Sequence, residues 1–131
     1  MKYLVDSDFL ISFSSVDDSN HAKSLKIYKD LDKKSELLAL NIVFQESTTV
    51  VSKRFGMDKA KLFYEMVNKF INTRILLDEN LEKDAWKVFL KQSKKGTSFI
   101  DCANLATFQK YKLKGILSFD EYYPKNVRMT S

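Results

Sequence analysis

The segment Tyr3-Leu4-Val5-Asp6 consists of three apolar residues followed by an acidic one. Such a run is typical of a short buried strand whose last residue enters a loop. Near the other end of the chain, Gly115-Ile116-Leu117-Ser118 has the same apolar character, and Asp120 follows it. In an open parallel sheet, sites form beyond the carboxyl ends of the strands. Both segments therefore place an acid at that edge of a sheet.

Between these two segments, helical and strand-like stretches alternate. Further strands are expected at 37–40 and 74–77, with a weak last strand near 127–129. Apolar residues at helical spacing predict the remaining elements, which are helices at 8–13, 19–34, 41–55, 58–71, 81–89 and 98–111. A strand followed by two helices, repeated three times, predicts an α/β chain with three α/β/α layers. We expect a central sheet, mostly parallel, of four to five strands flanked by helices, in a single domain spanning 1–131.

Three details of the helices follow from the same pattern. In helix 19–34, the spacing predicts an inward face of Ala22, Leu25, Tyr28 and Leu31, with Ser19 or Asp18 as the N-cap. His21 shares this face, so we interpret it as a packing residue. Gly56 is expected to end helix 41–55, and Asp58 to cap the helix that follows.

The composition limits the class of protein. The chain has 131 residues, 44% hydrophobic and 30% charged, with three glycines and one proline. This excludes a disordered or low-complexity protein. Apolar runs are far shorter than the ~20 residues that cross a bilayer, and no signal-peptide pattern is present. The single cysteine, Cys102, excludes an internal disulfide and a cysteine zinc site. A cytoplasmic protein with no membrane association is expected.

Lysine and arginine outnumber the acids, 22 to 17, for a net charge of +5. If several acids gather in one pocket, the rest of the surface is more basic still, which suits a polyanion such as a nucleic acid. Two basic pairs are candidates for phosphate contacts: Lys53 with Arg54, and Lys94 with Lys95. The alternative for these residues is an ordinary solvated face.

Glu46 and Asp101 lie early in two of the predicted helices, so they can converge with Asp6 and Asp120 on one crevice. Clustered carboxylates repel one another unless a cation joins them. Mg²⁺ prefers oxygen ligands, and this chain offers acids but only one histidine. A bound divalent ion lowers the pKa of a water for in-line attack on a phosphodiester, giving 5′-phosphate and 3′-hydroxyl ends.

Each acid also has a structural alternative. Ser98 and Asp101 have the spacing of a capping box, in which the Asp101 carboxylate would accept a hydrogen bond from the Ser98 amide. Glu46 can be a solvated helix residue, and Asp120 can begin the turn that leads to Pro124. Asn104 follows Asp101 by about one helical turn, where it can bond a carboxylate.

Four segments carry a family resemblance: Leu4-Val5-Asp6-Ser7-Asp8, Gln45-Glu46, Ser98-Phe99-Ile100-Asp101 and Leu117-Ser118-Phe119-Asp120. In order and separation they resemble a PIN domain, and the length is similar to VapC-type ribonuclease toxins. The resemblance implies a metal-dependent ribonuclease in which Asp6, Glu46, Asp101 and Asp120 surround one or two Mg²⁺ or Mn²⁺ ions. It also implies that Ser118 orients a carboxylate or a water. Asp8 departs from the pattern, because relatives often have Asn or Ser there.

The same resemblance implies partners. An RNA-cutting toxin harms its own cell, so a cognate antitoxin is expected to obstruct the site, for instance with an Arg or Lys side chain. A homodimer is expected by analogy with the family.

Three other functions stay open at this point. A phosphoacceptor receiver module also gathers acids at strand ends, but it needs an Asp at the end of a central strand. A haloacid-dehalogenase-like phosphatase would use the Asp6-Ser7-Asp8 pattern and would leave Glu46 without a role. A PIN-like module that binds RNA or protein without cutting is the third.

Overall fold

The computed structural model describes residues 1–129, in which strands alternate with pairs of helices as the sequence predicts. The strands are β1 (Lys2–Val5), β2 (Glu36–Leu40), β3 (Thr73–Ile75), β4 (Gly115–Leu117) and β5 (Arg128–Met129). The helices are α1 (Ser7–Ser14), α2 (His21–Asp30), α3 (Asn41–Phe55), α4 (Met57–Phe70), α5 (Glu79–Leu90) and α6 (Phe99–Lys110).

The sheet has the order β3-β2-β1-β4-β5, and all four neighbouring pairs are parallel. From β1 the chain adds β2 and β3 on one side, and β4 then pairs with the other side of β1. The order of the strands thus reverses between β1 and β4. Crevices at such switch points are the usual ligand sites of open α/β sheets.

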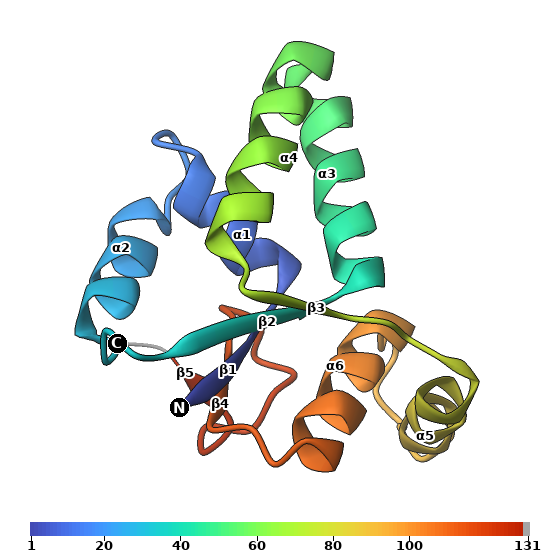
Figure 1. Ribbon diagram of the computed structural model, residues 1–131. Coiled ribbons are helices and arrows are strands. Elements are labelled where there is room, and N and C mark those ends of the chain that lie inside the picture. The colour runs from blue at the N-terminus through green and yellow to red at the C-terminus, as the bar shows by residue number, and fades with distance from the viewer. Residues whose placement is uncertain (130–131) are drawn as a thin grey trace.

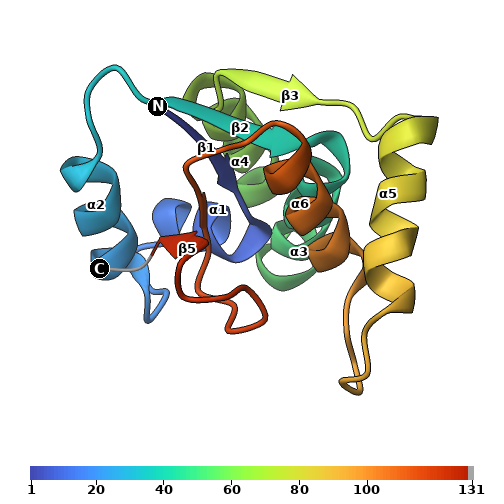
Figure 2. The same ribbon diagram turned by 90° about the horizontal axis from the view of Figure 1, so that it is seen from below.

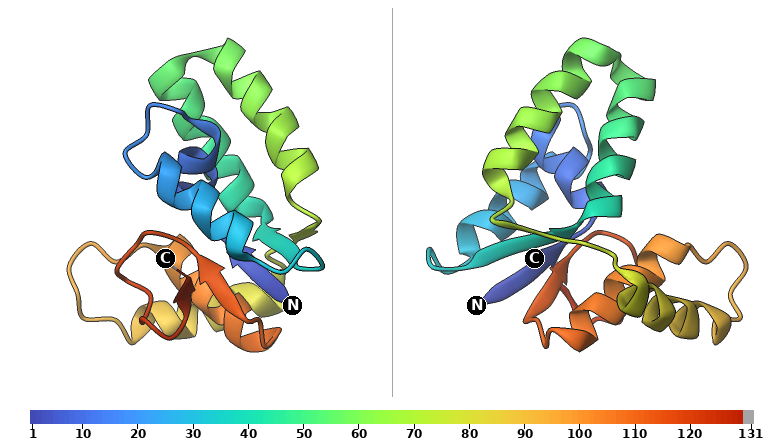
Figure 3. Two further views of the ribbon diagram at one scale, coloured as in Figure 1. Left: turned by 90° about the vertical axis from the view of Figure 1, so that its left-hand side faces the viewer. Right: turned by 45° about the vertical axis from the view of Figure 1, so that its right-hand side comes forward.

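Helices cover both faces of this sheet. Helices α1 to α4 lie on one face and α5 and α6 on the other (Figures 1 and 2). The α3–α4 pair extends well beyond the sheet (Figure 3). The strands are buried between the layers, as in Leu4, Leu40 and Ile116, which have no exposed surface. Within residues 1–129, no helix is both long and apolar enough to traverse a bilayer.

The predicted boundaries and inward face of the second helix are wrong. α2 begins at His21 after Asn20 and ends at Asp30, and its buried residues are Ser24 and Ile27. Ala22 is exposed. The Ser24 hydroxyl donates to the carbonyl of His21 at 2.7 Å, which lets a polar residue be buried at low cost.

Aromatic contacts explain the position of Tyr28, which is 44% exposed. Its ring packs against Phe13 and Phe70, with centroids 5.3 and 5.1 Å away, at the edge of the helical layer. The His21 ring is half-buried, and its Nδ1 lies 2.8 Å from the carbonyl oxygen of Ser12. His21 therefore joins α2 to α1, in agreement with a packing role.

Gly56 ends α3 as predicted, and its φ of +88° is a left-handed conformation that glycine adopts without strain. The same residue is also the N-cap of α4, so the prediction that Asp58 caps this helix is wrong. Asp58 lies in the first turn instead, where a negative charge favours the helix dipole.

Candidate metal centre

Asp6 is the residue that follows β1, and it is only 5% exposed. It caps α1, because its Oδ1 accepts a hydrogen bond from the Ser7 amide at 2.8 Å. Oδ1 also accepts from Asn104 Nδ2 at 3.2 Å, and Oδ2 accepts from the Ser118 hydroxyl at 2.9 Å. The carboxylate is thus fixed by donors from three segments of the chain.

Ser118 and Asp120 follow β4, on the other side of the switch point from Asp6. Ser118 has no exposed surface, and its hydroxyl accepts a hydrogen bond from the Asp120 amide at 3.0 Å while donating to Asp6. One buried hydroxyl therefore orders the segment that carries Asp120 relative to the carboxylate of Asp6.

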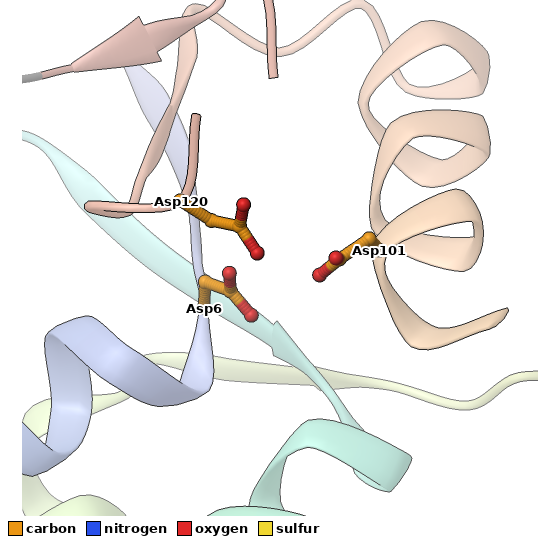
Figure 4. Close-up of side chains that lie close together, drawn as sticks. All are labelled: Asp6, Asp101 and Asp120. Atoms are coloured by element: carbon orange, nitrogen blue, oxygen red, sulfur yellow. The ribbon is translucent and has the colours of Figure 1, made fainter. Parts of the chain in front are cut away.

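Asp101 lies in the first turn of α6 and approaches the site from the opposite side. Ser98 caps this helix by accepting from the Ile100 amide at 3.1 Å. The capping-box alternative for Asp101 is wrong, because its Oδ1 accepts from the hydroxyl of Tyr123 at 3.2 Å and its side chain points toward Asp6 and Asp120 (Figure 4).

The three aspartates Asp6, Asp101 and Asp120 each offer one carboxylate oxygen, and these oxygens lie within 4.8 Å of one another. They come from the end of β1, the start of α6 and the loop after β4, and converge on one point (Figure 4). This spacing allows one divalent ion to lie among the three carboxylates, bound to them directly or through its own waters.

Glu46 is not part of this three-acid group, in contrast to the expected set of four. It is half-buried in α3, and its Oε1 accepts a hydrogen bond from the Ser7 hydroxyl at 2.6 Å. Its charge nevertheless raises the pKa of Asp6. Glu46 therefore lies beside the group of three aspartates and outside it.

The electrostatics of the site favour a cation. Burial, with the charges of Asp120 and Glu46, raises the pKa of Asp6 from 3.8 to about 6. Burial, with the charges of Asp6 and Asp120, raises the pKa of Asp101 to about 8. Within residues 1–129 no lysine or arginine forms an ion pair with these acids, since the ion pairs found are both on the surface, Lys26–Asp30 and Lys83–Glu79.

The Asp8 carboxylate binds the segment that follows β4. Its Oδ2 accepts from the Phe119 amide at 3.1 Å, and the Ser118 hydroxyl lies 3.3 Å from its Oδ1. Burial and the charge of Asp6 raise the pKa of Asp8 to about 7. Asp8 therefore links α1 to the loop after β4, and it is outside the group of three aspartates.

Sequence reasoning found the hydrogen bond from Asn104 to a carboxylate but missed Tyr123 and Ser7. Tyr123 is 1% exposed and contacts Asp101, while Ser7 holds Glu46. Neither position follows a periodic pattern, because Ser7 lies at a helix start and Tyr123 in an irregular loop. The one available signal was the pair of aromatic residues that follows Asp120.

The basic candidates are all on the surface. Lys53 and Arg54 are exposed in the last turn of α3, and Lys94 and Lys95 are exposed in the loop between α5 and α6. Trp86 is 43% exposed and packs on Phe99, with ring centroids 4.3 Å apart.

The chain has a parallel three-layer α/β fold with three acids grouped at the switch point of its sheet. This combination places it among α/β proteins with a candidate cation site. Residues 3–128 match the family model described as PIN domain. The chain therefore belongs to the PIN domain family. Compared with curated proteins by sequence, it has no match.

Solved structures have the same fold. VapC20 of Mycobacterium tuberculosis, a toxin that cleaves the sarcin–ricin loop, has a TM-score of 0.80 at 19% identity, covering 91% of this chain and 90% of that one. VapBC2 of Rickettsia felis bound to a DNA fragment from its promoter has a TM-score of 0.74 at 12% identity, covering 98% of each. A toxin–antitoxin complex from Klebsiella pneumoniae has a TM-score of 0.66 at 14% identity, covering 98% and 96%.

Proposed function

We propose that this protein is a divalent-metal-dependent endoribonuclease and the toxin of a toxin–antitoxin pair, with its nuclease site in a single domain. The observation that carries the proposal is the group of three carboxylates, Asp6, Asp101 and Asp120, with oxygens within 4.8 Å of one another. Membership of the PIN domain family and a fold shared with toxin proteins support it.

The residues present fit Mg²⁺ or Mn²⁺. All donors in the group are carboxylate oxygens, the ligand type that Mg²⁺ prefers. The raised pKa values of Asp6 and Asp101 mean that their ionised forms lack a compensating charge, which a cation would supply. The soft ligands of the chain point elsewhere, since Cys102 Sγ contacts the Tyr122 hydroxyl and His21 contacts Ser12.

We assign a role to each residue of the site. Asp6, Asp101 and Asp120 would hold the ion, and Glu46 is the fourth acid, adding negative charge beside Asp6. Ser118 holds Asp6 and the Asp120 backbone in their relative orientation. When bound, the ion lowers the pKa of a water and offsets the charge that builds up on the scissile phosphate.

The proposed substrate is RNA. The net charge of +5 favours a polyanion, and exposed Lys94 and Lys95 precede the helix that carries Asp101. Lys53 and Arg54 lie about 11 Å along α3 from Glu46, at 1.5 Å per residue, where they would contact phosphates flanking the cut. Because VapC20 cleaves the sarcin–ricin loop, a structured RNA loop is a suitable first substrate.

The proposed partners are a cognate antitoxin and a second copy of this chain. The structurally similar VapBC2 and the Klebsiella pneumoniae assembly are toxin–antitoxin complexes. An antitoxin that placed an Arg or Lys beside Asp6 and Asp101 would supply the positive charge that residues 1–129 do not provide there. We place the protein in the cytoplasm, where both partners would be available.

The other functions have less support. A phosphatase would use Asp6 together with Asp8, whereas Asp6 is grouped with Asp101 and Asp120, and Asp8 is outside that group. A receiver module would require an Asp at the end of a central strand, whereas β2 is followed by Asn41. Asp78 comes after the edge strand β3 and caps α5 by accepting from the Leu81 amide. A PIN-like module that binds RNA or protein without cutting would not need Asp6, Asp101 and Asp120 to lie together.

The test is cleavage of a structured RNA by purified protein with Mg²⁺, with Mn²⁺ and with EDTA. We expect cleavage that needs the ion, leaves 5′-phosphate and 3′-hydroxyl ends, and disappears in Asp120→Asn. Asp17→Asn, at an exposed acid between α1 and α2 that is outside the group, serves as the matched control and should cleave normally. Cleavage by Asp120→Asn at the wild-type rate would refute the proposed metal-dependent nuclease site.

A further inference from the structure

Tyr123 and Asn104 join two of the three acids through a chain of hydrogen bonds. The Tyr123 hydroxyl donates to Asp101 Oδ1 at 3.2 Å. Asn104 Nδ2 donates to the Tyr123 oxygen at 3.1 Å and to Asp6 Oδ1 at 3.2 Å. The chain therefore runs from Asp6 through Asn104 and Tyr123 to Asp101, with a hydrogen bond at every step.

Both connecting residues are buried, Tyr123 to 1% exposed and Asn104 to 0%. Burying a hydroxyl or an amide costs free energy unless it is hydrogen-bonded. Phenylalanine and leucine would fill the same volumes without this cost. The Asn104 Nδ2 and the Tyr123 hydroxyl offset this cost through their hydrogen bonds to the carboxylates, whereas Asn104 Oδ1 is buried without a partner among the described residues. These two side chains are therefore connected to the acids and do not serve packing alone.

The donors are neutral, which matters for a site that has to attract a cation. A lysine or arginine at either position would cancel the charge of Asp6 and Asp101 and compete with an ion. The phenol of a tyrosine ordinarily titrates near pH 10, so at neutral pH the Tyr123 hydroxyl carries its proton and donates it to Asp101. Neutral donors hold the carboxylates close together and leave their charge available.

Tyr123 also belongs to the segment that carries the third acid. Its amide donates to the Asp120 carbonyl at 3.4 Å, in the loop that follows β4. The buried Tyr123 ring therefore anchors the loop that places Asp120, besides bonding Asp101.

We propose that Tyr123 and Asn104 are positioning residues, which hold Asp6 and Asp101 at the spacing that one divalent ion requires before the ion arrives. The inference rests on the proposed function, because it assigns a role toward the same ion. Residues that orient metal ligands typically contribute about 10- to 100-fold to metal affinity.

The experiment is a titration of the metal-free protein with Mn²⁺, followed by calorimetry. We expect Tyr123→Phe and Asn104→Leu, both close in shape to the natural residues, to bind Mn²⁺ about 10- to 100-fold more weakly. Tyr122→Phe is the matched control, because the neighbouring Tyr122 hydroxyl contacts Cys102 Sγ at 3.4 Å and no carboxylate of the described residues. It should bind Mn²⁺ as the wild type does.

The double variant distinguishes a linked chain from two independent structural effects. If Asn104 and Tyr123 act through one chain, Tyr123→Phe with Asn104→Leu should weaken binding by clearly less than the product of the single effects. If the double variant loses Mn²⁺ affinity by the full product of the two single effects, the two residues do not act through one chain of hydrogen bonds. Circular dichroism and melting in EDTA check that each variant folds. If Tyr123→Phe does not fold, the Mn²⁺ affinity of Asn104→Leu tests the positioning role.

Failure of the inference and failure of the proposed function give different results. If wild-type protein binds Mn²⁺ and Asp101→Asn weakens binding while Tyr123→Phe and Asn104→Leu bind normally, the positioning role is wrong and the metal site stands. If wild-type protein binds no Mn²⁺, the proposed function itself fails, and the positioning role fails with it.

Discussion

Ser118 donates a hydrogen bond to Asp6 Oδ2 at 2.9 Å, although the two residues are 112 positions apart in the chain. The contact spans the point where the order of the strands reverses, between β1 and β4. The same hydroxyl accepts from the Asp120 amide at 3.0 Å. Ser118 is therefore placed to set the relative positions of two of the three acids.

Replacing Ser118 by alanine removes both contacts. We expect Ser118→Ala to bind Mn²⁺ about 10- to 100-fold more weakly and to cleave RNA correspondingly slowly at limiting metal. Ser118→Thr keeps the hydroxyl and should lose much less. Calorimetric titration of both variants measures the effect, and equal affinity of Ser118→Ala and wild type would contradict the role given to this hydroxyl.

The stability of the metal-free protein should depend on pH. The pKa of Asp6 is raised from 3.8 to about 6, that of Asp8 to about 7 and that of Asp101 to about 8. Between about pH 4 and pH 8 the folded protein therefore holds more protons than the unfolded chain, so its stability falls as pH rises. In EDTA the melting temperature should drop across this window, and saturating Mg²⁺ should reduce the drop because the ion binds the ionised carboxylates.

Asp101→Asn provides the control for this pH effect. The amide does not titrate, so the drop in EDTA should be smaller than in wild type. A melting temperature in EDTA that rises from pH 5 to pH 8 would show that these carboxyls do not govern the pH dependence. A drop that Asp101→Asn leaves unchanged would show that Asp101 does not contribute to it.

Ser98 and Asp101 have different roles in α6, so substitutions of the two should have different effects. Asp101→Asn is expected to abolish RNA cleavage and to leave the fold intact, because Ser98 caps the helix independently. Ser98→Ala should lower the free energy of unfolding by about 1 kcal/mol and leave the affinity for Mn²⁺ unchanged. Chemical denaturation and metal titration of the two variants check both halves, and full activity of folded Asp101→Asn would refute the metal role.

Much of this fold is predictable because its signals are local. The run that ends in Asp6 and the run before Ser118 are short, apolar and followed by polar residues, so their strand ends can be placed to within a residue. Gly56 is equally readable, since a left-handed helix end favours glycine. The rule that parallel strands gather their carboxyl ends then brings Asp6 and Asp120 together.

What could not be predicted depends on packing between elements. The distance of Glu46 from the other acids is set by the angle of α3, and no spacing in the sequence encodes that angle. The inward face of α2 was misplaced because Ser24 is buried by bonding its own helix, which a count of apolar residues does not detect. Tyr123 reaches Asp101 from an irregular loop whose course follows from tertiary contacts alone.

RNA binding should depend on salt and on the surface lysines. Exposed Lys94 and Lys95 are proposed to contact phosphates, so Lys94→Ala with Lys95→Ala should weaken binding and reduce the dependence of log affinity on log salt by about 2. Lys26→Ala, which removes an ion pair with Asp30 in α2, is a control on another surface. Binding measured by fluorescence anisotropy over a range of KCl concentrations gives both slopes. If the double variant and the wild type have the same dependence of log affinity on log salt, these two lysines do not contact the RNA phosphates.

The most direct measurement of the central claim is a crystal structure of the protein soaked in Mn²⁺, with anomalous data collected near the manganese edge. We expect a strong anomalous peak between the carboxylates of Asp6, Asp101 and Asp120, about 2.0–2.3 Å from the nearest oxygens. No peak at this position, at a Mn²⁺ concentration that supports RNA cleavage, would contradict it.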